Sequence, residues 1–341
     1  MKNKFLDDCY NAIKDQPAAI SRTLDPVNRP STLNGIINAP RIFLIGAGDS
    51  YIVSLFGSLA FTQLGLNAHA YEVVDALQIP FRKGDALIAI SASGRSTQLI
   101  QAVKRAVKAD IEIYGLTENP KGALSEIVDN LWLTQAHPRT FDISPSSTTT
   151  SALALLMLLI DEFSRIEYSK HVGYTQILEQ NTNNILKWSE SWGKRTANEI
   201  KTKNVIYFLG IGPTCITAML GMMKIHEYAV AKGIAMHMEE FAHHTKLIVN
   251  KREPVILLPL KYSCRDEYFK MLTKDIRQIL QADLFVVQQP SIDYMYYDFL
   301  ESIFLIFPLQ FLAYYIAKSH EPPILGWRAP HATAFKIYKD I

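Results

Sequence analysis

The chain has 341 residues, which is more than one hydrophobic core usually holds, so two domains or one duplicated domain are expected. Hydrophobic residues make up 48% of the sequence and charged residues 20%, the proportions of a folded globular protein. The formal net charge is only +2, and no run of Lys and Arg interleaved with aromatics occurs. We therefore expect a small-molecule ligand and no nucleic-acid partner.

The cysteines and the apolar runs indicate where the protein works. Three cysteines are odd in number, far apart and outside any CxxC spacing, which favours reduced thiols in a cytoplasmic protein. The first ten residues lack the apolar core of a signal peptide. The apolar runs 152–160 and 303–317 are too short or too interrupted to span a bilayer, which takes ~20 apolar residues. We expect core helices and no membrane partner.

Taken in order, the chain begins with apolar residues at helical spacing over 5–24, which predicts one leading helix lying over the first domain. A β-rich run at 41–45 then meets a glycine turn at 46–50, and a helical pattern follows. Strands alternating with helices predict a parallel sheet covered on both faces, whose ligands bind at the carboxyl ends of the strands. The further elements expected here are strands at 68–74, 86–90, 111–116 and 128–133 and a helix at 96–107.

One of these carboxyl ends, IAISASGRST at 88–97, has the composition of an anion-binding turn. Gly94 lets the backbone approach an anion closely. The first amides of the following helix lack intrahelical partners and face the positive end of the helix dipole. The hydroxyls of Ser91, Ser93 and Ser96 could then hold a phosphate without a lysine. The alternative interpretation is an ordinary serine N-cap.

The second half of the chain repeats the design of the first. The sequence NVIYFLGIGPT at 204–214 echoes PRIFLIGAGDS at 40–50, and both contain paired glycines. Gly46 in the first half corresponds to Gly210 in the second. Gly57 corresponds to Gly221 at the same offset of 164 residues (210 − 46 and 221 − 57). This pattern predicts an internal duplication.

The two halves differ at the hydroxyl turn. The second half has LPLK at 258–261 in its place, with neither the hydroxyl cluster nor the glycine. We therefore expect the first domain, 1–170, to bind the phosphate. The second domain, 171–341, is expected to supply catalytic groups.

Candidate chemical groups cluster in that second half. Lys224 and Glu227 share one face of the helix after the second glycine turn, although a solvated surface pair is the alternative. The segment HMEEFAHH at 237–244 contains three histidines and two carboxylates. Zinc is the alternative there, but the HExxH spacing is absent and no cysteine is near, so we expect no metal.

These features together resemble the sugar isomerase (SIS) domain family, specifically the isomerase domain of glucosamine-6-phosphate synthase. AMLGMMKIHE at 218–227 matches the family's ALEGALKLKE helix without gaps, 240–245 falls on ELKHGP, and PLQFLAYYIA at 308–317 matches PLQLLAYHVA. The resemblance covers nearly the whole chain after the leading helix. It implies two tandem SIS domains, each a doubly wound parallel sheet in a flavodoxin-like three-layer α/β/α arrangement.

The resemblance also implies a role for each matched residue. Glu227, beside Lys224, would move a proton between C1 and C2 of the sugar. His243 would open the sugar ring, often across a dimer interface, and Lys336 could form an imine with the open-chain sugar. The implied phosphate ligands are Ser50, Ser91, Ser93, Gly94 and Ser96, and weaker sugar contacts are assigned to Asp49, Ser144 and Glu240.

The sequence departs from the family pattern at several positions. Asp49 stands where the family has threonine, and a carboxylate near a phosphate is unfavourable unless it binds a sugar hydroxyl. His244 and Thr245 replace Gly-Pro, and the turn at 143–149 lacks the family's lysine. Only residues 1–40 precede the first expected strand, so we expect no glutaminase domain and no ammonia drawn from glutamine by that route.

These observations predict a cytoplasmic homodimer that isomerises or deaminates a hexose 6-phosphate without metal or cofactor. The leading candidate reaction converts glucosamine 6-phosphate to fructose 6-phosphate and ammonia. Such chemistry needs a base over C1 and C2, a group that titrates near neutral pH and an amine. The alternative is a sugar-phosphate sensor, which would keep the serine turn and could lose the catalytic set.

Overall fold

The computed structural model describes residues 3–25, 34–136, 143–168, 173–261, 263–290, 298–320, 324 and 326. They divide into two compact units, each built on one sheet. The first-sheet unit draws on Lys14–Phe141 and Pro145–Gln180, and the second-sheet unit on Met1–Ile13, Asp142–Ser144 and Asn181–Ala329.

The first-sheet unit contains five parallel strands in the order β2-β1-β3-β4-β5. This is the strand order of flavodoxin-like doubly wound folds, so the predicted α/β architecture is confirmed. The strands are β1 (Ile42–Gly46), β2 (Ala68–Glu72), β3 (Ala86–Ile90), β4 (Glu112–Thr117) and β5 (Asn130–Leu133). The helices are α2 (Gln16–Leu24), α3 (Asn34–Ile37), α4 (Asp49–Gln63), the 3-10 turn η2 (Asp75–Gln78), α5 (Thr97–Lys108) and α6 (Ser147–Tyr168).

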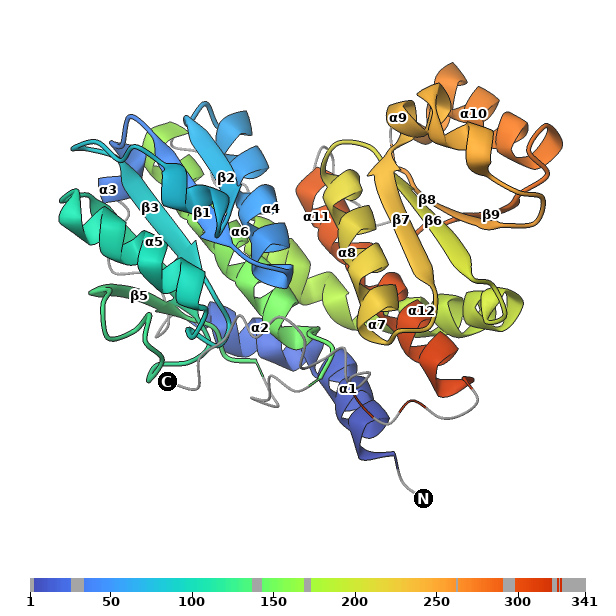
Figure 1. Cartoon of the computed structure of the whole chain (residues 1–341), viewed down its shortest axis with the longest axis horizontal. Helices are drawn as coiled ribbons and strands as arrows, with labels where there is room; N and C mark the ends of the chain where they lie inside the picture. The colour runs from blue at the N-terminus through green and yellow to red at the C-terminus, as the bar shows by residue number, and fades with distance from the viewer. Residues whose placement is uncertain are drawn as a thin grey trace. The chain divides into compact units, whose positions relative to one another are not determined.

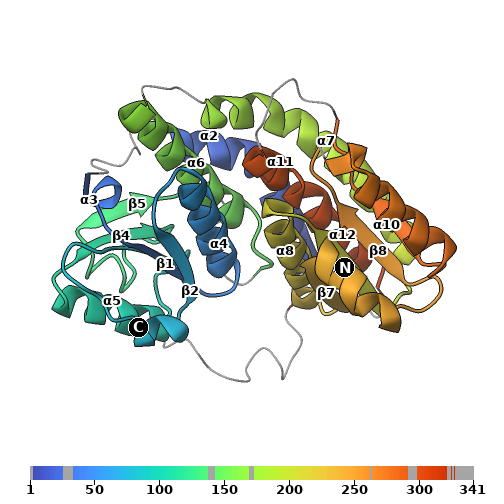
Figure 2. The ribbon, with the colours of Figure 1, turned by 90° about the horizontal axis from the view of Figure 1, so that it is seen from above.

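Alternating residues of the first sheet pack under helices on its two faces (Figures 1 and 2). Phe43 and Leu87 join buried residues of α5, such as Val103, in one core cluster. On the opposite face, Leu44 of β1 lies against α4, so both faces of these strands are apolar. This explains why β1 and β3 are continuous apolar runs in the sequence.

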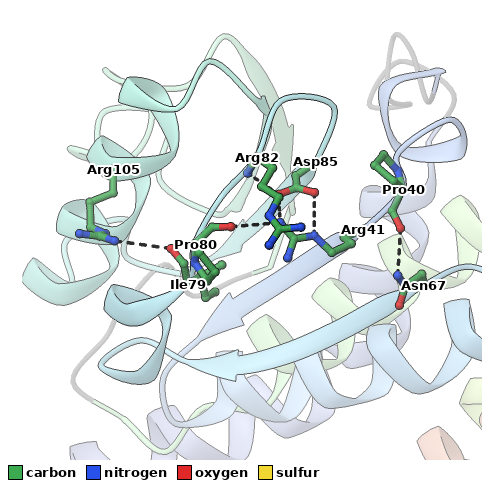
Figure 3. Close-up of polar contacts among 8 residues, drawn as sticks. All are labelled: Pro40, Arg41, Asn67, Ile79, Pro80, Arg82, Asp85 and Arg105. Atoms are coloured by element: carbon green, nitrogen blue, oxygen red, sulfur yellow. Dashed lines mark hydrogen bonds and ion pairs between the residues drawn. The ribbon is translucent and has the colours of Figure 1, made fainter.

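The amino ends of β1 and β3 are tied together by a charged pair (Figure 3). The Arg41 guanidinium donates to both carboxylate oxygens of Asp85, at 2.9 and 2.6 Å, and to the carbonyl of Pro80 at 3.0 Å. Asp85 is buried and also accepts the amide of Arg82 at 2.7 Å. This bidentate pair fixes the two strands at the edge opposite their carboxyl ends.

The second-sheet unit contains four parallel strands in the order β7-β6-β8-β9. Its strands are β6 (Val205–Gly210), β7 (Lys232–His237), β8 (Pro254–Leu258) and β9 (Asp283–Val286). Its helices are α1 (Lys4–Lys14), α8 (Pro213–Glu227), α9 (Met238–His243), α10 (Glu267–Gln278), α11 (Asp298–Phe304) and α12 (Ile306–Lys318), with 3-10 turns η3 (Thr245–Ile248) and η4 (Ser263–Arg265). The long helix α7 (Tyr174–Ile200) continues from one unit into the other.

The glycines that suggested a duplication have matching environments in the two units. Gly48 and Gly212 both have positive φ, at 57° and 52°, which favours glycine in each turn. A Cβ at Gly57 would lie 2.5 Å from Leu44 Cδ2, and one at Gly221 would lie 2.6 Å from Leu309 Cδ1. In both units, therefore, a side chain at this position would force a neighbouring leucine to move.

The leading helix differs from the prediction. It is two helices, α1 and α2, separated at Asp15, because Pro17 cannot donate a helical hydrogen bond and its ring crowds the carbonyl four residues before it. Proline is accepted in the first turn of the new helix α2. Residues up to Ile13 also belong to the second-sheet unit and not to the first.

A glutamate anchors α1 within the second-sheet unit. The hydroxyls of Tyr10 on α1 and Tyr315 on α12 both donate to Glu190 Oε1 on α7, at 2.7 and 2.8 Å. This arrangement fixes the side of α1 that carries Cys9, a buried residue.

One helical stretch among the described residues, Asp298–Lys318, has the length and composition to cross a membrane. The sequence predicted core helices in this region. Consistent with this, 89% of its most apolar window is buried within the fold, as in a core helix.

Candidate functional sites

Two pairs of turns lie where doubly wound sheets bind ligands. In each sheet the strand order reverses beside the first strand, between β1 and β3 and between β6 and β8. Ligands of such folds bind outside the carboxyl ends of the strands at this switch point. The turns 46–50 and 91–96 follow β1 and β3, and the turns 210–214 and 259–261 follow β6 and β8.

The serine turn after β3 is closed on itself around a glycine. The amide of Gly94 donates to the carbonyl and to the hydroxyl oxygen of Ser91, at 3.2 and 3.1 Å. Gly94 has a φ of +64°, which a residue with a side chain adopts only at a cost. Ser96 occupies the N-cap position of α5, yet its hydroxyl makes no capping bond. An ordinary serine N-cap therefore does not describe this turn.

Residues at the carboxyl end of the neighbouring strand β4 and just after it hold the carbonyls of this turn. Thr117 Oγ1 donates to the carbonyl of Ala92 at 3.1 Å, and Asn119 Nδ2 donates to that of Ser93 at 2.9 Å. The amide of Leu124 donates to the carbonyl of Gly94 at 3.1 Å. With these acceptors engaged, the amides and hydroxyls of the turn suit an anion. Sequence reasoning missed Thr117 and Asn119, although Thr117 ends the adjacent strand and Asn119 follows it closely.

In the turn after β1, Asp49 accepts a hydrogen bond from a residue of its own unit. Asp49 is the first residue of α4, and its Oδ2 accepts a hydrogen bond of 2.5 Å from the hydroxyl of Thr149 in the first turn of α6. The N-terminus of α4 also favours a carboxylate there. Ser50, the other predicted ligand of this turn, is half-buried beside it.

The second-sheet unit brings together three predicted site residues. Lys224 Nζ lies 3.0 and 2.9 Å from the two carboxylate oxygens of Glu227, and the Ser144 hydroxyl donates to Glu227 Oε2 at 2.6 Å. The Lys224 side chain is only 1% exposed and that of Glu227 18%. The pair is therefore not a solvated surface pair. A fixed carboxylate that is largely buried yet partly exposed is the form expected of a proton-transfer group.

Two buried residues that sequence reasoning missed lie behind this carboxylate. Both side chains are buried, and the Tyr228 hydroxyl and the Cys9 thiol lie near each other and near Ser144. Burial raises the pKa of Tyr228 well above its usual value and raises the pKa of Cys9. Tyr228 directly follows Glu227, but its apolar surroundings in sequence gave no sign of a role.

The remaining predicted groups are not joined to Glu227 by the described contacts. His243 Nε2 lies 3.1 Å from Glu239 Oε1 on the same helix, α9, and its side chain is 68% exposed. Glu240 pairs in the same way with His244, at 3.1 Å. Lys336 lies outside the described residues, so its role stays a prediction.

In the second-sheet unit, a carboxylate of the protein occupies the turn after β8. The amide of Lys261 donates to Oε2 of Glu301 at 3.0 Å, and burial raises the pKa of Glu301. Thr214, the counterpart of Ser50, donates its hydroxyl to the carbonyl of Leu258 at 2.6 Å. The turn at 258–261 thus binds an internal acceptor, in keeping with the loss of the hydroxyl cluster from its sequence.

The described residues contain no group of three His, Cys, Asp or Glu side chains that could hold a metal ion.

The sequence of this chain is similar to SIS domains and to isomerizing aminotransferases. Residues 35–161 match the SIS domain family. The glutamine–fructose-6-phosphate aminotransferase (isomerizing) of Sulfurisphaera tokodaii is 26% identical over 251 residues, which are 72% of this chain and 42% of that relative. The chain spans about half the length of the curated relatives it matches.

Two solved structures share the fold, each with a TM-score of 0.76. One is the C-terminal domain of the Francisella tularensis glucosamine-fructose-6-phosphate aminotransferase, 16% identical, covering 90% of this chain and 94% of that one. The other is the Thermotoga maritima glucosamine-6-phosphate deaminase, 20% identical, covering 92% and 94%.

Proposed function

We propose that this chain, whose residues 35–161 belong to the SIS domain family, isomerises or deaminates a hexose 6-phosphate. The leading candidate is glucosamine 6-phosphate, converted to fructose 6-phosphate and ammonia. One observation carries the proposal: Glu227 is held by a buried lysine and a buried serine while part of its side chain stays exposed. The names of the relatives, an isomerizing aminotransferase and a deaminase, support this class of substrate.

In this proposal the serine turn binds the phosphate. Ser91, Ser93 and Ser96 supply hydroxyls, Gly94 lets the backbone approach, and the first amides of α5 face the anion. Ser50, from the turn after the adjacent strand β1, adds another hydroxyl. Asp49 would accept a hydroxyl of the sugar, a role that its bond to Thr149 leaves possible because a carboxylate has several acceptor sites.

Glu227 then moves the proton. As a carboxylate it removes the proton from C2 of the open-chain sugar and returns it to C1. Lys224, at 2.9–3.0 Å, favours the ionised carboxylate before the transfer. For an aminosugar, the C2 proton moves to C1 and one proton of the amine nitrogen passes to O1, which leaves an imine at C2 and a hydroxyl at C1; water then replaces the imine nitrogen to release ammonia and the ketose. Every atom is then accounted for by substrate and one water.

Ring opening and the second subunit belong to the same proposal. We assign ring opening to His243 because histidine exchanges protons near neutral pH, and we keep Lys336 as an amine for an imine with the open-chain sugar. The proposed assembly is a homodimer. Leu247 and Ile248 of η3, close in sequence to His243, are 79% and 62% exposed, which supports an interface at this edge.

A panel of amino- and keto-hexose 6-phosphates, with detection of ammonia and of sugar interconversion, tests the proposed function. We expect turnover of at least one phosphorylated sugar and none of its unphosphorylated form. Binding of these ligands without turnover of any of them would contradict the enzyme and support a sugar-phosphate sensor.

A further inference from the structure

The serine turn after β3 is held by the stretch 117–124, which ends strand β4 and follows it. Three successive carbonyls of the turn, those of Ala92, Ser93 and Gly94, accept hydrogen bonds from this stretch. The turn and the stretch are in direct contact, because a Cβ at Gly122 would lie 2.9 Å from the Ser93 carbonyl oxygen. The strand order places β4 and β1 on opposite sides of β3, so these carbonyls point away from β1.

The planarity of the peptide bond decides where the amides of this turn point. In a trans peptide the C=O and the following N–H point in opposite directions. Because the carbonyl of Ala92 points toward Thr117, the amide of Ser93 points away from β4, toward the switch point between β3 and β1. The carbonyl of Gly94 is also turned toward the stretch after β4, so the amide of Arg95 points the same way as that of Ser93. Ligands of this fold bind at the switch point.

The amide of Ser93 is the backbone donor that this arrangement leaves for a ligand. It makes no hydrogen bond with any residue in the described part of the chain. The amide of Gly94, in contrast, is used within the turn, by the carbonyl and the hydroxyl oxygen of Ser91. The Ser93 amide can therefore donate to a phosphate oxygen, and the Ser93 hydroxyl can donate to the same anion.

From this geometry we propose that Thr117 and Asn119 are positioning residues, which hold the carbonyls of the serine turn toward β4 so that the Ser93 amide faces the phosphate. The inference rests on the proposed phosphate-binding role of this turn. If these bonds were lost, the peptide groups of the turn could rotate and present a carbonyl oxygen to the anion, which would repel it.

Both side chains are themselves fixed by further hydrogen bonds. Thr117 Oγ1 accepts the amide of Asn119 at 3.1 Å, which leaves its one hydroxyl proton for the carbonyl of Ala92. Asn119 Oδ1 accepts the amide of Lys121 at 3.1 Å, so Nδ2 is directed at the carbonyl of Ser93. Thr117 is fully buried and cannot touch a ligand, so any effect it has on binding must pass through the turn.

Two variants remove these donors. Thr117→Val removes the hydroxyl and keeps the shape of the side chain, and Asn119→Ala removes Nδ2. We expect each to raise the Kd for inorganic phosphate about three- to tenfold, the range that corresponds to one hydrogen bond. Isothermal titration calorimetry well below the unfolding temperature measures this change. Thr117→Ser, which keeps the hydroxyl, should bind phosphate more tightly than Thr117→Val.

Two controls separate positioning from general stability. The Ser125 hydroxyl donates to the carbonyl of Asn119 at 2.7 Å, so Ser125→Ala weakens the same stretch without removing a bond to the turn. Asn67 is a matched asparagine, whose Nδ2 also donates to a carbonyl at 2.9 Å, that of Pro40 at the amino ends of the strands (Figure 3). Ser125→Ala and Asn67→Ala should leave the phosphate Kd unchanged. A lower urea midpoint with an unchanged Kd in Thr117→Val and Asn119→Ala would overturn the proposal.

Amide NMR of the labelled protein follows the Ser93 donor directly. At saturating phosphate, the Ser93 amide proton should shift downfield and exchange more slowly with water in the unaltered protein and in both controls. Both effects should be smaller in Thr117→Val and Asn119→Ala. Equal effects in all of these proteins would contradict the positioning role.

The outcomes distinguish this inference from the proposed function. Phosphate binding in the expected order without turnover of any sugar would contradict the proposed reaction and support the positioning role. Phosphate binding that neither variant weakens would overturn the positioning role and leave the phosphate turn in place. Failure of the unaltered protein to bind phosphate would overturn both.

Discussion

Ser93 lies in the proposed phosphate turn, and its hydroxyl is held only weakly by the protein. Its Oγ accepts only a long bond, 3.4 Å, from the amide of Arg95. A ligand phosphate can therefore take this hydroxyl as a donor without breaking a strong internal bond. Ser91 differs, because it is buried and its hydroxyl oxygen already closes the turn on Gly94.

We expect Ser93→Ala to weaken binding of a hexose 6-phosphate by about 1–3 kcal/mol, the cost of leaving a charged acceptor without one donor. Isothermal titration calorimetry with a phosphorylated sugar measures this loss. Ser58→Ala is the control in the same unit, since the Ser58 hydroxyl donates to the carbonyl of Ala68, away from the turn. Equal affinity for glucose and glucose 6-phosphate in the unaltered protein would show that the turn binds no phosphate.

At the scale of elements, the contact of α4 with β1 depends on Gly57. A Cβ there would lie 2.5 Å from Leu44 Cδ2 and 3.1 Å from Leu156 Cδ1. Both leucines are buried and cannot move away freely. Alanine is the better helix former by about 1 kcal/mol. Overpacking of a core costs about 1–3 kcal/mol and opposes this gain.

We therefore expect Gly57→Ala to lower the free energy of unfolding by up to about 2 kcal/mol, measured by urea denaturation. Leu44→Val relieves the contact, so the double variant Leu44→Val/Gly57→Ala should lose less than the sum of the two single losses. A Gly57→Ala protein more stable than the original would mean that helix propensity outweighs packing here. The close approach of α4 would then not require glycine.

At the scale of the whole chain, the two sheets are built alike, but the turns at their switch points carry different groups. One has a turn whose hydroxyls and amides suit an anion, and the other turn already binds the carboxylate of Glu301. The second-sheet unit also contains the buried Lys224–Glu227 pair. In the proposed function, the first turn binds the phosphate and Glu227 transfers the proton.

The features that the sequence predicted are those encoded over short stretches. Strand β3 begins and ends where its apolar run does, and the glycine pairs fall in equivalent turns because positive φ and close packing demand glycine locally. Lys224 and Glu227, three residues apart, could be paired from helical spacing alone.

The features that the sequence did not predict depend on contacts between distant stretches. Thr149 meets Asp49 across 100 positions and Ser144 meets Glu227 across 83. Cys9 lies near Tyr228 only because α1 packs in the second-sheet unit, whereas helical spacing alone placed that helix over the first domain. Periodicity shows which face of a helix is buried but not what it packs against.

The role of Glu227 is tested most directly by exchange of the substrate C2 proton. In deuterated water, the unaltered protein should exchange the C2 proton of a hexose 6-phosphate that it binds, as seen by proton NMR. Glu227→Gln should still bind the sugar but exchange about 10²–10⁴-fold more slowly, because a proton shuttle contributes to the transition state and little to ground-state affinity. Exchange surviving intact in Glu227→Gln would contradict the account and direct attention to another carboxylate, Glu240 first.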